Sequence, residues 1–356
     1  MKIGVVGPSL KMGGMERAST TMANSLTDIG NEVCFLSLFS QEDFFKLNNQ
    51  VQLFTPNGFN TSKLSLFKTL IWIRTSLKQF NPDVVLVYGR FYGAIVSLAL
   101  LFTHYRVFIS ERSSPLFKWA IHINFFDRIV YWLLPPAGVV AQTKIAMLYQ
   151  QKYYSKKSPV RVIPNQVKQV KEFPEVEKAK IILAVGRFND YLKGFDRLIE
   201  AYALLNGHKG WRLVFAGGDE DGQYLRDLAD SCGIMANVDF LGKVEDIDRV
   251  YAEAGIFVIP SRSEGFPNAL CEAMAAGLPC VAFDFIAGPR DLIIHRENGF
   301  IVPDGDLEAL ANQIKELIDN EQLRSKVGEK ARGIAKMLDQ KVIAKRMCDF
   351  LNNTNR

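Results

Sequence analysis

The sequence is poor in the residues that build disulfide frameworks and zinc centres. Among its 356 residues are five cysteines and four histidines, and the cysteines are scattered singly, without a CxxC pair or a Cys/His ligand spacing. An odd, dispersed set of cysteines excludes a disulfide scaffold as the main source of stability and fits a reducing compartment. We therefore expect a cytoplasmic protein without structural zinc.

Long hydrophobic runs are missing as well. The longest apolar run, Gly93–Phe102, is about half of the roughly 20 residues that a transmembrane helix needs. The N-terminal apolar stretch is too short for a signal peptide and leads directly into a glycine-rich turn, so it reads as a first strand. We expect no membrane-spanning helix and no targeting segment.

Internal repeats and low-complexity tracts are also absent, and what the chain does contain is alternating structure. Short apolar runs rich in β-formers alternate with helix-length amphipathic segments, which is typical of α/β folds with parallel sheets. The length favours two domains. A polar stretch with two prolines, Pro164 and Pro174, follows Ile163 and marks the linker, which predicts domains at 1–164 and 165–340.

Twelve strands are predicted, six on each side of this linker. They are Lys2–Val6, Glu32–Leu38, Val84–Tyr88, Arg106–Ser110, Gly138–Ala141, Val160–Ile163, Ile181–Val185, Arg212–Ala216, Val238–Leu241, Ile256–Ile259, Cys280–Phe283 and Phe300–Val302. Helices are predicted at Met15–Leu26, at Ser65–Phe80 and over most of the chain after Leu307.

Charge is divided unevenly between the two halves. Residues 1–164 hold 18 Lys and Arg against 8 Asp and Glu, whereas the remainder holds 25 against 30. The basic half either faces an anionic partner or carries an ordinary solvated surface, since net charge governs association and not fold.

Two glycines, Gly13 and Gly14, stand between the first strand and the first helix. Glycines at a helix N-terminus let a diphosphate approach backbone N–H groups, although they also serve simple tight turns. The spacing is not GxGxxG, and no acidic residue ends the second predicted strand to hold an NAD ribose. These two features argue against a dinucleotide oxidoreductase.

Two cations follow the strand that ends at Val185. Arg187 comes directly after Gly186, and Lys193 precedes Gly194 and a helix. The loops at the carboxyl ends of parallel strands bind ligands in open α/β sheets, so this spacing suits a diphosphate clamp. Solvated surface charges are the alternative.

Two glutamates lie in the segment 260–277, PSRSEGFPNALCEAMAAG. Glu264 is on a loop, and Glu272 is in the helix that opens near Pro267. We expect residues 267–270 to offer free backbone donors to an anion. A carboxylate near such a site suits sugar hydroxyls, whereas an ordinary capping or ion-paired role is the alternative for Glu272.

From Ile181 to Asp306 the runs GRFNDYLKG, FAGGDEDG, VDFLGKV, EGFPNALCEA and GPRDLIIHRENGFIVPDGD follow one another. In these motifs and their order the chain resembles the retaining family 4 glycosyltransferases. The resemblance implies the GT-B fold, in which two Rossmann-like domains with parallel sheets face each other across a cleft. It assigns the acceptor to domain 1–164 and the nucleotide sugar to domain 165–340, with a C-terminal helix, 341–356, crossing back to the first domain.

The same resemblance implies the site residues. Glu264 contacts the donor sugar while Arg187 and Lys193 bind the diphosphate, which makes these three the catalytic set. Donor binding falls to Gly13, Gly14, Lys243, Val244, Phe266, Pro267, Asn268, Ala269, Leu270 and Glu272, of which Glu272 holds the ribose hydroxyls. Backbone contacts near Lys243 suit uracil, so the implied co-substrate is a UDP-sugar. No cofactor and no essential metal are expected, and the acidic triplet 219–221 reads as a solvated turn.

One position departs from the family. Where several relatives have a histidine, this chain has Arg112, which cannot act as a general base. Glu111 and Arg112 are therefore predicted contacts of the acceptor or the sugar.

The implied reaction moves a hexose or N-acetylhexosamine, with retention, to a glycan acceptor. The resemblance favours a lipid-diphosphate-linked acceptor in surface polysaccharide, O-antigen or capsule synthesis. The segments Leu64–Phe80 and Leu116–Leu134 are aromatic or amphipathic, and they either rest on an anionic membrane at its inner face or form core helices. A UDP-sugar 2-epimerase and a non-catalytic sugar-nucleotide-binding subunit are the alternative functions; nucleic acid is not an expected partner.

Overall fold

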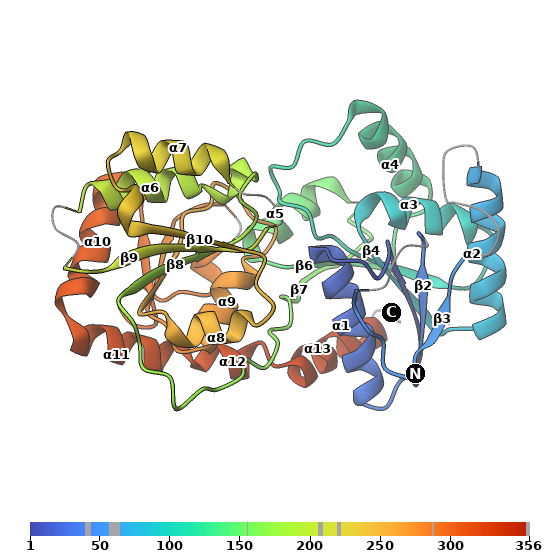
Figure 1. Cartoon of the computed structure of the whole chain (residues 1–356). Coiled ribbons are helices and arrows are strands. Elements are labelled where there is room, and N and C mark those ends of the chain that lie inside the picture. The colour runs from blue at the N-terminus through green and yellow to red at the C-terminus, as the bar shows by residue number, and fades with distance from the viewer. Residues whose placement is uncertain are drawn as a thin grey trace. The chain divides into compact units, whose positions relative to one another are not determined.

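The chain forms two compact units (Figure 1). In the computed structural model, residues 1–39, 44–56, 65–154, 156–205, 209–218, 222–286 and 288–353 are described. Unit 1 consists of Met1–Gln166 together with Leu338–Arg356, and unit 2 of Val167–Met337. Unit 1 thus extends two residues past the predicted boundary at 164, and the C-terminal segment joins it from Leu338 and not from 341.

Unit 1 is built on a seven-stranded parallel sheet in the order β3-β2-β1-β4-β5-β6-β7. Its strands are β1 (Lys2–Gly7), β2 (Glu32–Ser37), β3 (Gln52–Phe54), β4 (Val84–Tyr88), β5 (Arg106–Ser110), β6 (Gly138–Ala141) and β7 (Val160–Val162). Its helices are α1 (Gly14–Asp28), α2 (Leu66–Phe80), α3 (Arg90–Ala99), α4 (Ile121–Leu133), α5 (Lys144–Tyr153) and α13 (Gln340–Asn353). Strand β4 is buried along its whole length, as expected of a central parallel strand that is covered on both faces.

Unit 2 is built on a six-stranded parallel sheet in the order β10-β9-β8-β11-β12-β13. Its strands are β8 (Ile181–Val185), β9 (Arg212–Ala216), β10 (Val238–Gly242), β11 (Ile256–Ile259), β12 (Cys280–Phe283) and β13 (Phe300–Val302). Its helices are α6 (Phe195–Ala203), α7 (Gln223–Ser231), α8 (Ile247–Glu253), α9 (Asn268–Ala275), α10 (Leu307–Asp319), α11 (Glu321–Ala331) and α12 (Gly333–Met337). The described residues of unit 2 also form single turns of 3₁₀-helix at η2 (Tyr191–Lys193), η3 (Met235–Asn237) and η4 (Pro289–Asp291). Helices α6 and α7 cover one face of this sheet, and α8 and α9 cover the other (Figure 1).

All twelve predicted strands are present, with ends that differ by at most one residue. Strand β3 was not predicted, because it is a three-residue strand at the edge of the sheet and is largely exposed. Among the described helices, none is long and apolar enough to span a membrane.

Helix α13 packs within unit 1. Its buried side chains are Ile343, Ala344, Met347, Phe350 and Leu351. The ring of Phe350 meets that of Phe108 on β5 at 5.6 Å between centroids. The Gln166 side-chain amide donates to the Gln340 carbonyl at 2.9 Å, so the start of α13 is tied to the end of the first unit-1 segment.

Candidate functional site

The sheet of unit 2 has a switch point between β8 and β11. From β8 the chain proceeds outward through β9 and β10 on one side, and then through β11, β12 and β13 on the other. The loops at the carboxyl ends of the two strands diverge there, and open α/β sheets bind ligands in the resulting crevice. The two loops are residues 186–194 after β8 and 260–267 after β11.

An ion pair joins these two loops. The Lys193 Nζ lies 2.8 Å from Glu264 Oε1, and the Ser261 hydroxyl donates to the same oxygen at 2.8 Å. The Lys193 and Glu264 side chains are 22% and 12% exposed, so both are mostly sheltered yet reachable. Within the described part of the chain, no group bonds the second oxygen, Glu264 Oε2. Two of the three predicted catalytic residues therefore lie side by side at the switch point.

Glycines allow the two loops to meet. Gly194 has a φ of +67°, and a Cβ there would lie 2.1 Å from the Pro260 carbonyl oxygen, so the two backbones touch without an intervening side chain. A Cβ on Gly186 would lie 3.1 Å from Lys193 Cδ. The stem of Lys193 consequently lies over Gly186, which directs its ammonium group toward Glu264.

Arg187, the other predicted phosphate ligand, has a different partner. Its guanidinium pairs with Asp190 at 2.7 Å, and its side chain is 77% exposed. The structure thus brings Lys193, and not Arg187, to the glutamate. Exposed ion pairs contribute little free energy, so exchanging Asp190 for a phosphate would cost little.

Glu272 is buried on α9 at 6% exposure. The Tyr251 hydroxyl of α8 donates to its Oε2 at 3.2 Å. Buried carboxylates are rare unless they are hydrogen-bonded. Tyr251 therefore supports Glu272 from the neighbouring helix.

The N-terminus of α9 offers fewer backbone donors than the sequence predicted. Pro267 has no N–H, so its assignment as a backbone donor is wrong. The Asn268 N–H is already bonded to the Phe266 carbonyl at 2.9 Å. This leaves Ala269 and Leu270 as candidates, and because the Leu270 side chain is fully buried, its contact with a ligand would be through the backbone.

The loop after β10 carries the residues assigned to the base. Gly242 has a φ of +63°, and its carbonyl accepts from the Gly217 N–H at 2.7 Å. Lys243, which is exposed, and Val244, which is half-buried, follow it. The acidic triplet 219–221 lies outside the described residues. In the described ranges, no group of three or more His, Cys, Asp or Glu residues could hold a metal ion.

Gly13 and Gly14 lie at the corresponding switch point of unit 1, between β1 and β4. A Cβ on Gly13 would lie 2.1 Å from Glu16 Oε2, whereas Gly14 has no neighbour within 4 Å of that position. A diphosphate at this helix start would therefore have to displace the Glu16 carboxylate, which now occupies the positive end of α1.

Glu111 and Arg112 follow β5 in unit 1. The Glu111 Oε1 accepts from the N–H groups of Arg112 and Ser113, both at 3.1 Å. The Arg112 guanidinium lies 4.9 Å from the Tyr88 ring centroid and donates to Asn165. Burial lowers the pKa of Arg112, opposed by Tyr88 and Glu111. Arg112 is therefore held by protein groups, whereas one oxygen of Glu111 is directed to its own loop.

Sequence reasoning missed Tyr251 as a partner of Glu272 and gave Ser261 no role. Tyr251 stands 21 residues from Glu272, and no local pattern connects the two. Ser261 lies three residues before Glu264, so a Ser-x-x-Glu spacing on the loop was a usable signal.

Comparisons with known proteins agree with this architecture. The family model "Glycosyl transferases group 1" matches residues 165–334, and "Glycosyltransferase Family 4" matches residues 12–168. The amylovoran biosynthesis glycosyltransferase AmsD of Erwinia amylovora is 28% identical, covering 96% of each chain. A Campylobacter jejuni enzyme, GalNAc-α-(1→4)-GalNAc-α-(1→3)-diNAcBac-PP-undecaprenol α-1,4-N-acetyl-D-galactosaminyltransferase, is 27% identical, covering 93% of each.

The fold matches solved structures over the same span. Anabaena HepE, solved in complex with UDP-glucose, superposes with a TM-score of 0.80 at 19% identity, covering 99% of this chain and 100% of the other. The two family models together span residues 12–334, which include both sheets and the switch-point loops. The chain belongs to glycosyltransferase family 4 and is a glycosyltransferase of the GT-B fold.

Proposed function

We propose that this enzyme transfers a hexose or N-acetylhexosamine, with retention, from a UDP-sugar to a lipid-diphosphate-linked glycan in surface polysaccharide synthesis. The observation that carries the proposal is the Lys193–Glu264 pair at the switch point of unit 2. It places a cation suited to a diphosphate beside a carboxylate suited to sugar hydroxyls. The UDP-glucose bound to HepE and the undecaprenol-linked acceptor in the name of the Campylobacter relative support the two substrate classes. The family match gives no support to the epimerase alternative.

Stabilisation of the charge on the leaving UDP would lower the activation barrier. Lys193 and, after leaving Asp190, Arg187 would neutralise the charge that develops on the departing UDP. The Ala269 and Leu270 N–H groups would add to this at the start of α9. The leaving phosphate oxygen would assist the acceptor hydroxyl on the same face of the sugar, so no side-chain nucleophile is required.

The remaining donor contacts follow from the same pose. Glu264 Oε2 would accept a hydrogen bond from a sugar hydroxyl while Oε1 keeps Lys193 and Ser261. Glu272 would accept from the ribose hydroxyls, and backbone groups at Lys243 and Val244 would pair with uracil. Because the cations supply positive charge to the diphosphate, we propose that transfer needs no metal ion.

A thermal-shift panel tests the donor assignment. UDP should raise the melting temperature more than GDP or ADP, and Glu272→Gln should reduce the UDP shift. Glu329→Gln, an exposed position on α11, is the control and should keep it. Equal shifts for the three nucleotides, or a UDP shift unchanged in Glu272→Gln, would refute the assignment. Transfer from the best UDP-sugar should then persist in EDTA.

Helix α4 supports the proposed membrane contact. Its exposed face carries Ile121, Phe125 and Ile129 at four-residue spacing, followed by Trp132, and its buried residues include Asp127. Ile121 is 87% and Trp132 80% exposed. Two exposed cations, Lys118 and Arg128, lie just before and within α4. An apolar helix face with such basic neighbours suits the interface of anionic membranes. We propose that α4 rests on the cytoplasmic face of the membrane that holds the acceptor.

Vesicle cosedimentation tests this contact. The wild type should bind vesicles that contain anionic lipid more than zwitterionic ones, and Phe125→Ser/Trp132→Ser should lose most of this binding. The matched control is Phe102→Ser, which changes a side chain that is 92% exposed outside α4. Equal binding by the double variant and the wild type would rule out α4 as the contact.

A further inference from the structure

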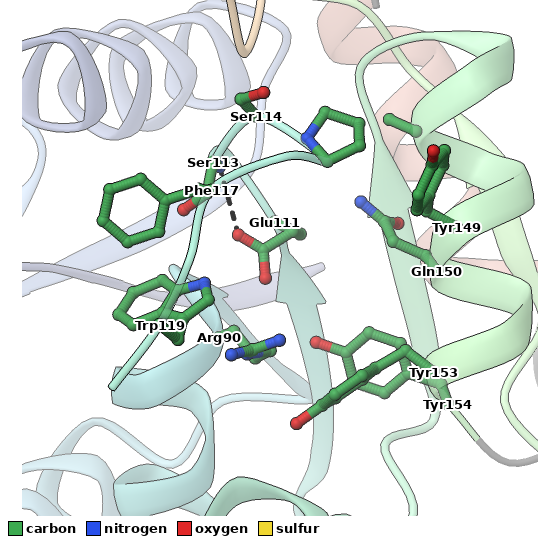
Figure 2. A pocket seen from close by; sticks show the side chains of 12 residues that line it. Arg90, Glu111, Ser113, Ser114, Phe117, Trp119, Tyr149, Gln150, Tyr153 and Tyr154 are labelled. Atoms are coloured by element: carbon green, nitrogen blue, oxygen red, sulfur yellow. Dashed lines mark hydrogen bonds between the residues drawn. The ribbon is translucent and has the colours of Figure 1, made fainter. Parts of the chain in front are cut away.

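Unit 1 contains a pocket that the donor chemistry does not use. It has a volume of about 120 Å³ and lies between the segment after β5, the start of α3 and the last turns of α5 (Figure 2). Arg90 follows β4 and Glu111 follows β5, so both belong to the carboxyl edge of the sheet. In parallel α/β sheets this is the edge that binds ligands.

The base of the pocket is a fixed guanidinium. Arg90 is 8% exposed, and its Nε lies 3.0 Å from Asp127 Oδ2, while another nitrogen donates to Asn124 Oδ1 at 2.6 Å. The guanidinium also stacks on the rings of Trp119 and Tyr153, with 5.0 Å and 4.5 Å to the centroids. Ion pairing and stacking on two rings hold Arg90 in one position, as a preorganised binding group requires.

Several buried polar atoms on the side chains that line this pocket have no partner among the described residues. Among the described residues, none bonds Gln150 Oε1, the Tyr153 hydroxyl or the Tyr154 hydroxyl, although Gln150 is only 7% exposed. Figure 2 shows Glu111 with one oxygen bonded to the Ser113 N–H and the other directed away from that bond. An unpaired buried polar group is costly, and folded proteins keep few of them. Unsatisfied acceptors and hydroxyls at one cavity point to a ligand with several hydroxyl groups.

The lining offers little to an anion. Arg90, which lines the pocket, is already paired with Asp127 at 3.0 Å, and the other charged lining residue is the carboxylate of Glu111. A neutral polyol can donate to Glu111 and Gln150 and accept from Arg90. The aromatic side chains Phe117 and Trp119 provide flat walls for the C–H faces of a sugar ring.

We propose that this pocket is a subsite for one neutral pyranose ring, the terminal sugar of the acceptor glycan. The volume lies below the roughly 300 Å³ at which sites for larger ligands begin, which limits the subsite to a single ring. The inference rests on the proposed function, because the acceptor is what supplies the sugar. It assigns acceptor selection to Arg90, Glu111 and Gln150, and not to Arg112.

Saturation-transfer NMR on the full chain tests the subsite directly. The probes are the methyl α-glycosides of glucose, galactose, N-acetylglucosamine and N-acetylgalactosamine, each tested alone. At least one should receive saturation, and Gln150→Leu should raise its Kd by about three- to tenfold, as expected for one lost hydrogen bond. Gln313→Leu, at a glutamine of unit 2 with 8% exposure, is the matched control and should bind as the wild type does. If Gln150→Leu fails to fold, Tyr153→Phe removes a single hydroxyl of the same pocket.

UDP binding, measured on the same samples by thermal shift, separates the two proposals. Retained UDP binding with weakened glycoside binding in Gln150→Leu supports the subsite. Two results would overturn the subsite and leave the donor assignment intact, provided that UDP still binds. In the first, the wild type binds none of the glycosides; in the second, Gln150→Leu and Gln313→Leu bind them equally well. A wild type that does not bind UDP at all would overturn the proposed function itself.

Discussion

Replacing Lys193 with methionine removes one charge from the switch point and little else. The Lys193 stem lies over Gly186, where a Cβ would meet its Cδ, Cε and Cγ at 3.1 to 3.2 Å. Methionine has nearly the same length and can keep this packing, so the variant tests the ammonium group that lies 2.8 Å from Glu264. If Lys193 contacts the diphosphate, UDP must bind more weakly.

The size of this effect follows from the contact. A hydrogen bond to a charged group contributes about 1.5 to 3 kcal/mol. Lys193 already bonds Glu264 in the free enzyme and would share its protons on binding, so we expect the lower end of the range. This corresponds to a Kd for UDP raised by about 10- to 30-fold. Glu264→Gln should instead leave UDP affinity within about threefold, because it removes a negative charge near the phosphates, and it should slow sugar transfer.

Isothermal titration calorimetry with UDP measures both variants. The control is Lys209→Met, which breaks an exposed pair with Asp319 in the same unit and should leave the Kd unchanged. A Kd within about threefold of wild type in Lys193→Met would refute the phosphate role. Equal losses of affinity in Lys193→Met and Glu264→Gln would show that the pair only maintains the loop conformation.

Two further predictions concern stability. Burial raises the pKa of Asp127 to about 6 against the opposing effect of Arg90, so the native state binds this proton more tightly than the unfolded chain does. The free energy of unfolding that this group contributes therefore falls as the pH rises from about 4 to about 6. In urea titrations over that range, Asp127→Asn should gain up to about 3 kcal/mol relative to the wild type, and a relative loss would mean that the attraction of Arg90 outweighs burial. Gly194→Ala should lower the free energy of unfolding by at least about 2 kcal/mol, because the new Cβ meets the Pro260 carbonyl. The control is Gly233→Ala, at a glycine with a φ of +71° and open space around it, which should lower the same free energy by about 1 kcal/mol. Equal losses in the two variants would contradict the close contact between Gly194 and Pro260.

Much of the fold could be predicted from sequence because its central strands are buried on both faces. Strands such as Val84–Tyr88 and Ile256–Ile259 are continuous apolar runs between turn residues, and their ends were predicted to the residue. The edge strand β3 has no such run, since Gln52 and Leu53 are exposed. Its pairing with β2 depends on a neighbour that sequence periodicity does not reveal.

The site was predicted in part, and the limits follow from contacts between distant segments. Glycine-rich loops at strand ends indicated where a ligand would lie, and Lys193 and Glu264 do meet there. The sequence could not show that Arg187 turns to Asp190 or that Arg112 turns to Tyr88, because both are choices among nearby partners of a long cation. The pocket beside Arg90 combines residues from α3, α5 and the segment after β5, so no single sequence motif predicts it.

Unit 1 is built from two segments that are far apart in the sequence, and this sets the order in which it can fold during synthesis. Helix α13 covers α1 and brings Phe350 against Phe108, yet it is made after the whole of unit 2. At about 5 to 20 residues per second, the ribosome needs roughly 10 to 30 s to pass from Gln166 to Leu338. At the end of that interval unit 2 is complete, whereas unit 1 still exposes the apolar surface that α13 covers. A nascent chain that stops between unit 2 and α13 would therefore carry a complete unit 2 and an unfinished unit 1, whose exposed apolar surface chaperones and proteases can recognise.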